Sequence, residues 1–145
     1  MARPKAKGEP FSIRLSLATE RFVEAEARRT RRPKGAIVEA LTEEAARMRR
    51  FPGIAFRGED AGREAWVVGS GLDVWEIVEM LEDHGAVKRL TAETHLTERQ
   101  VAVAEAYRES YPDEIDEALA ENRRPLDALR ELFPFVDSFE VEAPG

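Results

Sequence analysis

Three side chains that can form hydrogen bonds alternate with four apolar side chains near the start of the sequence. The polar residues are Ser12, Arg14 and Ser16, and the apolar residues are Phe11, Ile13, Leu15 and Leu17. This strict alternation predicts a β-strand with one apolar face and one polar face. The two segments that follow, residues 18–30 and 34–50, have the spacing of amphipathic helices. The strand therefore has no neighbouring strand in this part of the chain.

A lone strand can bury its apolar face and pair its backbone by joining a second copy of itself. We therefore predict a homodimer with a two-stranded antiparallel ribbon, and the core of this ribbon consists of Phe11, Ile13, Leu15 and Leu17. Such a ribbon fits the major groove of B-DNA, where strand side chains can read base edges.

Composition limits the classes to which the chain can belong. It has 145 residues, of which 43% are hydrophobic, and this fraction argues against a disordered chain. There are no cysteines and only 2 histidines, and no apolar run is long enough for a membrane span or a signal peptide. We expect a cytoplasmic protein without a cofactor or a metal site. We do not expect an enzyme, because no nucleophile, base and orienting partner can be assembled.

Charge is distributed unevenly along the chain, whose net charge is −7. Residues 1–50 hold 13 Lys and Arg against 7 Asp and Glu, whereas residues 51–145 hold 9 against 22. The first part attracts a phosphate backbone and the second part repels it. Any DNA contact is therefore expected in the first part, and a different partner in the second.

Turn residues and periodicity predict the organisation of the chain. The fold class is mainly α, with a short β-hairpin at residues 54–57 and 65–68. Residues 18–30 and 34–50 are expected to be helical, and further helices are expected at 73–84, 86–94, 97–110, 113–122 and 125–132. The domains predicted are a flexible basic arm (1–10), a DNA-binding and dimerisation domain (11–50), an acidic helical domain (52–124) and a C-terminal helix with an aromatic, acidic tail (125–145).

The strand, the two helices and the basic turn between them resemble the ribbon-helix-helix DNA-binding proteins of the Arc, MetJ and CopG type. This resemblance implies that Ser12, Arg14 and Ser16 contact bases, and the Arg14 guanidinium suits guanine O6 and N7. It also implies a phosphate site at the start of the second helix, formed by Arg31, Arg32, Lys34 and Gly35. Pro33 stands where the family more often has a hydroxyl residue. This departure removes a capping oxygen and one amide donor, and predicts a weaker phosphate site.

Residues 52–124 resemble a small helix-turn-helix domain that accompanies PIN-like ribonuclease toxins in prokaryotic operons. The segments that carry this resemblance are GSGLDVWEIVEMLEDHG from Gly69 and LTERQVAVAEAYRESYPDEIDEAL from Leu96. The usual Gly-Thr-Arg stretch is replaced by Gly69-Ser70-Gly71. Together the two halves resemble a VapB-type antitoxin. The resemblance implies that the protein binds an operator in double-stranded DNA, represses its own operon and neutralises a PIN-like toxin.

Several alternatives remain open at this stage. The chain could be a stand-alone ribbon-helix-helix regulator without a toxin partner, or an interaction dimer without DNA. Residues 97–100 lie where a second recognition helix would begin, but nearby carboxylates favour protein contact there. The carboxylates of residues 76, 79, 82 and 83 are expected to form a solvated helix face. The tail residues Phe133, Phe135 and Phe139 either fold back on the protein or bind a partner.

Overall fold

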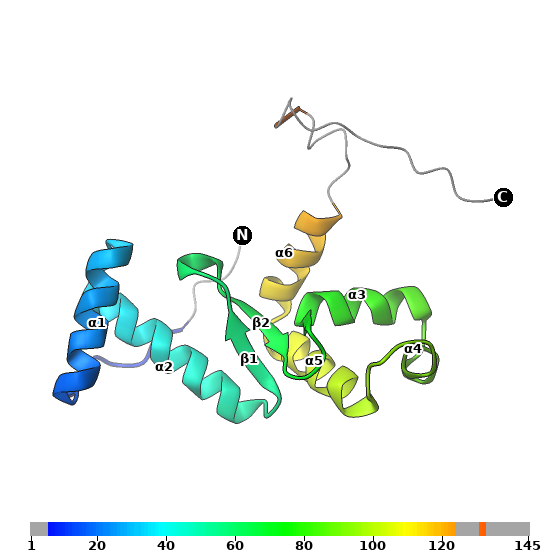
Figure 1. The fold of residues 1–145 in the computed structure, drawn as a ribbon, viewed down its shortest axis with the longest axis horizontal. Coiled ribbons are helices and arrows are strands. Elements are labelled where there is room, and N and C mark those ends of the chain that lie inside the picture. Colours follow the sequence, from blue (N-terminus) through cyan, green and yellow to red (C-terminus); the bar gives the residue numbers. More distant parts are fainter. Residues whose placement is uncertain (1–5, 124–130, 133–145) are drawn as a thin grey trace.

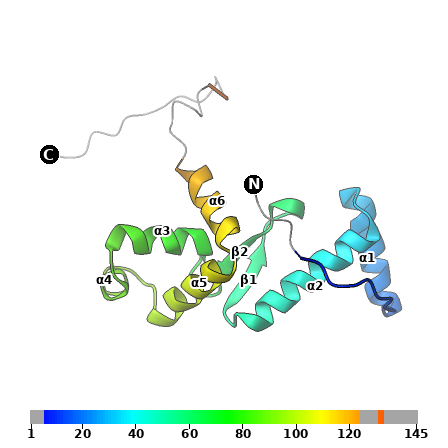
Figure 2. The same cartoon turned by 180° about the vertical axis from the view of Figure 1, so that it is seen from behind.

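The computed structural model describes residues 6–123, 131 and 132. Helices α1 (Leu17–Thr30) and α2 (Lys34–Arg50) form a hairpin at one end of an elongated molecule, and a small sheet lies beside the end of α2 (Figure 1). Helices α3 to α6 lie on the other side of this sheet, as the reverse view also shows (Figure 2). The described residues thus form a mainly helical protein with a three-stranded sheet, which confirms the mainly α class that was predicted.

The first two helices begin and end at residues with identifiable backbone roles. Ser16 caps α1 by accepting a hydrogen bond from the Thr19 backbone N–H at 3.3 Å. Arg31 ends α1 in the left-handed conformation, with φ of 53°. Pro33 precedes α2 and fixes the backbone angle there. The predicted bounds of α2 are confirmed at both ends, and α1 begins one residue earlier than expected.

The sheet is antiparallel, with strand order β1-β2-β3. Strands β1 (Ile54–Arg57) and β2 (Glu64–Val67) form the predicted hairpin, and a short 3-10 helix, η1 (Asp60–Gly62), lies in their connection. Strand β3 (Leu72–Asp73) was not predicted. It pairs with β2 because the Ser70 hydroxyl donates to the Val67 carbonyl at 2.6 Å and accepts from the Leu72 N–H at 3.0 Å, which closes the turn.

The four remaining helices follow the expected order. They are α3 (Val74–His84), α4 (Val87–Glu93), α5 (Glu98–Ser110) and α6 (Pro112–Asn122). Asp73 and Thr97 each form a reciprocal capping box at the start of α3 and α5. Gly85 ends α3 with φ of 77°, a conformation that glycine adopts without steric cost.

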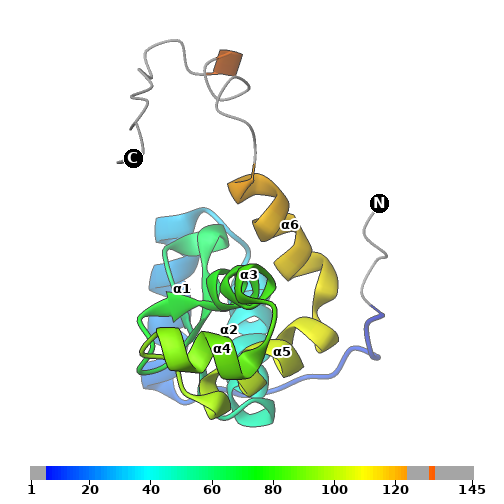
Figure 3. The same ribbon diagram turned by 90° about the vertical axis from the view of Figure 1, so that its right-hand side faces the viewer.

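One hydrophobic core lies among the sheet and helices α3 to α6. Its buried members run from Ile54 to Leu119, and Tyr107 is fully buried among them. The first two helices lie behind this core in the view along the long axis (Figure 3). They bury only two hydrophobic side chains in the single chain, Val23 and Ile37. The α1–α2 hairpin therefore lacks a substantial core of its own.

The strand predicted for residues 11–17 is not formed in the single chain. Residues 6–16 adopt neither helix nor strand, and Leu17 is the first residue of α1. A ribbon strand must pair with a second strand, and one chain supplies only one copy of this sequence. The ribbon itself therefore stays a prediction. The predicted helix at 125–132 lies mostly outside the described residues, of which 131 and 132 are helical.

Candidate nucleic-acid interface

The three residues expected to contact bases differ in their surroundings. Ser12 and Arg14 are exposed and lie in the segment that crosses α2 (Figure 2). Ser16 is exposed as well, but its hydroxyl donates to Thr19 Oγ1 at 3.0 Å and accepts from the Thr19 backbone. Ser16 therefore has a structural role at the start of α1, and this role accounts for its hydroxyl without any ligand.

The start of α2 has unbonded backbone donors. Ala36 and Ile37 donate to the Pro33 carbonyl, at 3.0 and 3.3 Å. Within the described part of the chain, the N–H groups of Lys34 and Gly35 have no acceptor, because Pro33 provides no side-chain cap. A Cβ atom at Gly35 would meet nothing within 4 Å, so the space beside these donors is open. Open amides at a helix N-terminus can bind an anion.

Lys34, whose own N–H is one of these donors, has partners on α1 for its side chain. Its Nζ atom lies 2.8 Å from Glu20 Oε1 and 3.7 Å from Glu24 Oε1. The hydrogen bond to Glu20 raises the pKa of Lys34 above its ordinary value. Lys34 is therefore cationic at neutral pH, and any phosphate that approaches it competes with two carboxylates.

The structure brings some of the expected site residues together and separates others. A groove of about 1800 Å³ runs between residues 6–15, α2 and the corner where α5 meets α6. Arg14, Lys34 and Gly35 line this groove, as do Phe11, Ile13 and Leu15. Arg31 and Arg32 do not line it. They lie in the α1–α2 turn, and neither forms an ion pair with another described residue.

Apolar side chains that were expected to form a dimer core are exposed in the single chain. The exposed fractions are 84% for Phe11, 53% for Ile13 and 70% for Leu17, whereas Leu15 is partly buried. On the two helices Phe22, Leu41 and Met48 are exposed too, by 53%, 40% and 44%. This concentration of large apolar side chains on a small hairpin is typical of a protein-protein contact surface.

A buried arginine joins the hairpin to the acidic half, and no pattern in the sequence indicates this contact. Arg47 of α2 donates to the Tyr107 hydroxyl at 2.7 Å and to Glu114 Oε1 at 3.0 Å. Its guanidinium carbon lies 3.8 Å from the ring centroid of Tyr111, and Glu43 accepts a further bond at 3.0 Å. We refer to Arg47, Tyr107, Tyr111 and Glu114 as the Arg47 cluster.

Ionisation in the Arg47 cluster follows from these contacts. Burial and the neighbouring Glu114 raise the pKa of Tyr107, so its hydroxyl keeps its proton and donates to Glu114 Oε2 at 2.6 Å. Burial alone would lower the pKa of Arg47, but its contacts with Tyr107, Glu114 and Glu43 outweigh burial and raise it. Arg47 is therefore a buried cation with matched partners, the arrangement in which a buried charge is tolerated.

Two exposed ion pairs also join the halves of the molecule. Arg29 of α1 lies 3.0 Å from Asp60 Oδ1 in η1. Arg63, just before β2, lies 2.8 Å from Glu44 Oε1 on α2. Exposed pairs contribute little individually, so the Arg47 cluster is the main polar contact between the hairpin and the rest of the protein.

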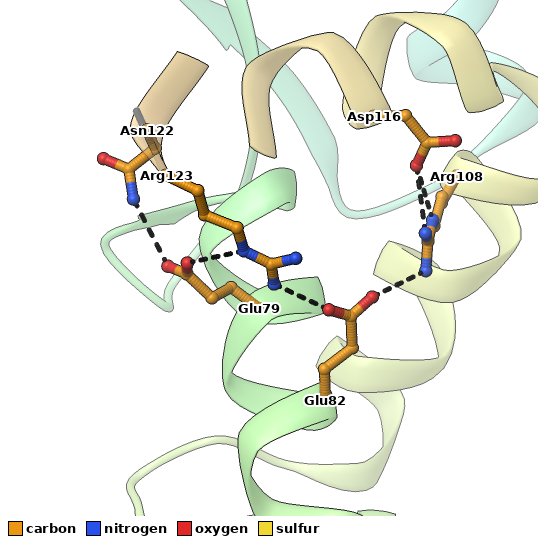
Figure 4. A network of polar contacts seen from close by, with 6 residues as sticks. All are labelled: Glu79, Glu82, Arg108, Asp116, Asn122 and Arg123. Carbon is orange, nitrogen blue, oxygen red and sulfur yellow. Dashed lines mark hydrogen bonds and ion pairs between the residues drawn. The ribbon is translucent and has the colours of Figure 1, made fainter. Parts of the chain in front are cut away.

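The acidic face predicted on α3 is partly neutralised by arginines. Arg123 lies 3.4 Å from Glu79 Oε1 and 2.7 Å from Glu82 Oε2. Arg108 of α5 connects Glu82 to Asp116 of α6 (Figure 4). These contacts lower the pKa of Glu82, chiefly through Arg123. Glu79 and Glu82 thus help to fix the end of α6 on α3. Glu82 is exposed, as expected for a solvated face, whereas Glu79 is only partly exposed.

The second expected recognition segment also has structural roles. Thr97 and Gln100 form the capping box of α5, while Glu98 and Arg99 are exposed.

Within the described residues no group of three or more His, Asp or Glu side chains could hold a metal ion. No described helix is long and apolar enough to cross a membrane. The tail residues Phe133, Phe135 and Phe139 lie outside the described residues.

Comparisons of the chain with protein-family models, with curated proteins and with solved structures found no match.

Proposed function

We propose that this protein is a homodimeric, sequence-specific DNA-binding antitoxin of the ribbon-helix-helix type, which represses its own operon and neutralises a PIN-like ribonuclease. The observation that carries the proposal is the α1–α2 hairpin. Its apolar side chains are exposed, while open amides and cations lie at the start of α2.

Dimer formation is supported by the balance of apolar burial. The hairpin and the segment before it expose six large apolar side chains, from Phe11 to Met48, and bury only two. Removing one such side chain from water contributes about 1.5–3 kcal/mol. A second copy that covers Phe11, Ile13 and Leu17 would therefore stabilise the hairpin substantially. The alternating pattern favours strand pairing as the means.

DNA binding is supported by the chemistry at one side of the hairpin. Arg14, Lys34 and the Gly35 amide line the same groove, so a base-reading arginine and a phosphate site would lie close together. Arg31 and Arg32 add charge at the adjacent turn. An exposed cation without a protein partner is available to a phosphate, and each phosphate contact releases counterions.

The second partner is supported by the charge of the other half. Residues 51–145 hold 22 Asp and Glu against 9 Lys and Arg, which disfavours DNA contact and favours a basic protein partner. The identity of that partner as a PIN-like ribonuclease rests on the resemblance of residues 52–124 to antitoxin-associated domains.

The proposal is tested by recovering the tagged protein from its native host and identifying both the bound protein and the bound DNA. We expect a small nuclease together with the protein's own promoter. Promoter DNA without a protein partner would leave a stand-alone regulator. Recovery of neither a nuclease nor promoter DNA would overturn the proposal.

The dimer is tested separately with Ile13→Lys, measured by analytical ultracentrifugation. We expect a monomer, because the substitution places a charge in the ribbon core. Ser12→Lys is the matched control on the opposite strand face, and it should leave the dimer intact. A dimer in both variants would exclude the ribbon as the interface.

A further inference from the structure

The cations of the candidate DNA surface fall into two groups. Lys34 pairs with Glu20 and Glu24 of its own chain, at 2.8 and 3.7 Å, and Lys7 pairs with Glu39 at 2.9 Å. By contrast, Arg14, Arg31 and Arg32 form no ion pair with any residue in the described part of the chain. Both lysines are therefore neutralised by the protein itself, and the arginines are not.

The two carboxylates near Lys34 are placed by helix geometry. Glu20 and Glu24 are four residues apart on α1, so their side chains project from the same face one turn apart. Lys34 is the first residue of α2, beside the open N–H groups of Lys34 and Gly35. Glu20 lines the same groove as Lys34 and Gly35. Carboxylate oxygens thus already contact the Lys34 ammonium, which in the proposed function contacts a phosphate oxygen.

The ion pairs at Lys34 can be exchanged at low cost. The exposed fractions of the side chains are 46% for Lys34, 39% for Glu20 and 52% for Glu24. Exposed pairs of this kind contribute little to stability, because both partners remain hydrated. A phosphate that also bonds to the free amides can therefore displace the carboxylates.

We infer that Glu20 and Glu24 set the affinity of the protein for DNA. Their carboxylates pair with the Lys34 ammonium in the free protein, and a DNA phosphate displaces them from it. This inference rests on the proposed function. It assigns the two glutamates a regulatory role, in which they weaken sequence-independent binding by competing at the phosphate site. Contacts made by Arg14 do not involve this competition. Base reading therefore contributes a larger share of the total affinity than it would without the two glutamates.

The inference is tested by the double variant Glu20→Gln/Glu24→Gln, which keeps side-chain size and removes both charges. The probe is a random-sequence 20-base-pair DNA duplex, and binding is followed by fluorescence anisotropy from low to moderate salt. If each protomer of the dimer loses one competing pair, the duplex should bind about 2- to 30-fold more tightly. The matched control is Glu105→Gln/Glu109→Gln, which removes the same charge from the exposed face of α5.

The decisive comparison adds Lys34→Ala to both backgrounds. We expect the gain from the two glutamine substitutions to disappear when Lys34 is absent, because the carboxylates act through it. An equal gain with and without Lys34, or a gain no larger than that of the α5 control, would overturn the inference and leave the proposed function standing. Failure of both the wild-type protein and the double variant to bind any duplex would overturn both.

Discussion

Removal of the Arg47 side chain is expected to uncouple the two halves of the protein. Arg47 is only 4% exposed, and it contacts Tyr107 and Glu114 across the boundary between α2 and the core. In Arg47→Ala these bonds and the contact with the Tyr111 ring are lost. The hairpin then remains joined to the core by the chain at residue 51, by the hydrogen bond from Arg50 to the Tyr111 hydroxyl and by exposed ion pairs.

The size of the effect can be worked out from the contacts. Each of the two hydrogen bonds that the guanidinium donates to Tyr107 and Glu114 is charge-assisted and contributes about 1.5–3 kcal/mol, and the stacking on Tyr111 contributes about 0.5–2 kcal/mol. Part of this is regained, because the Glu114 side chain is 46% exposed and can be hydrated when its partner is removed. Tyr107 also keeps its bond to Glu114. We therefore expect a loss of about 2–4 kcal/mol in the free energy of unfolding, near the range for breaking a buried pair.

Urea denaturation followed by two probes measures this loss. Both tryptophans, Trp66 and Trp75, lie in the second half, so their fluorescence reports on the core, whereas circular dichroism reports on all helices. The two transitions should coincide in the wild-type protein and separate in Arg47→Ala. Arg49→Ala is the matched control, since Arg49 is exposed on the same helix. A loss below about 1 kcal/mol, or one equal to that of the control, would refute the role assigned to Arg47.

Three further changes give predictions of different kinds. Arg31→Gly should stabilise the protein by about 0.5–1 kcal/mol in thermal denaturation, because φ of 53° suits glycine. The same variant should bind DNA more weakly, and its DNA affinity should depend less on salt. Unchanged DNA affinity would show that Arg31 does not contact phosphate. Glu64→Gln should stabilise the protein at pH 7 but not at pH 4, by less than about 1 kcal/mol, since Glu64 is exposed. Burial and the neighbouring Asp73 raise the pKa of Glu64, so the folded state binds this proton more tightly than the unfolded state. The wild-type protein therefore loses the stability contributed by this proton as the pH rises through the raised pKa, and the Gln variant avoids that loss. A variant whose melting temperature shifts equally at both pH values would contradict this. Arg123→Ala should release the end of α6 from α3, and faster amide hydrogen exchange confined to α6 would show this release. Arg99→Ala on the surface of α5 is the control. Unchanged exchange at α6 would mean that the buried Ile115 and Leu119 are sufficient to fix the helix.

The bounds of helices and strands were predicted well where proline or glycine residues mark the ends of a segment. The bounds Lys34–Arg50 and Ile54–Arg57 were predicted without error, because Pro33 and the Phe51-Pro52-Gly53 turn mark the ends of these segments. Strand β3 was missed because two residues carry no periodic signal, and it depends on a side-chain hydroxyl in the preceding turn. The strand predicted at 11–17 could not appear in one chain, since its predicted pairing partner is a second copy.

The Arg47 cluster could not have been predicted from one sequence. Arg47 is 60 residues from Tyr107 and 67 from Glu114 along the chain, and each residue type is ordinary at an exposed helix position. Sequence reasoning finds patterns that repeat within an element, and contacts between distant elements leave no such pattern. The pairing of Lys34 with Glu20 was missed for the same reason.

The Arg47 cluster also bears on how an acidic protein could approach DNA. Helix α2 begins at Lys34, in the proposed phosphate site, and ends near Arg47, where the acidic half is attached. A helix of 17 residues is about 25 Å long. The Debye length at physiological salt is about 8 Å, so a charge at one end of α2 is largely screened at the other. The contacts of Arg47 therefore attach the acidic half at the end of α2 opposite Lys34. Asp113, Glu114 and Glu117 of that half nevertheless line the same groove as Lys34, so these are the carboxylates that would repel a phosphate bound there.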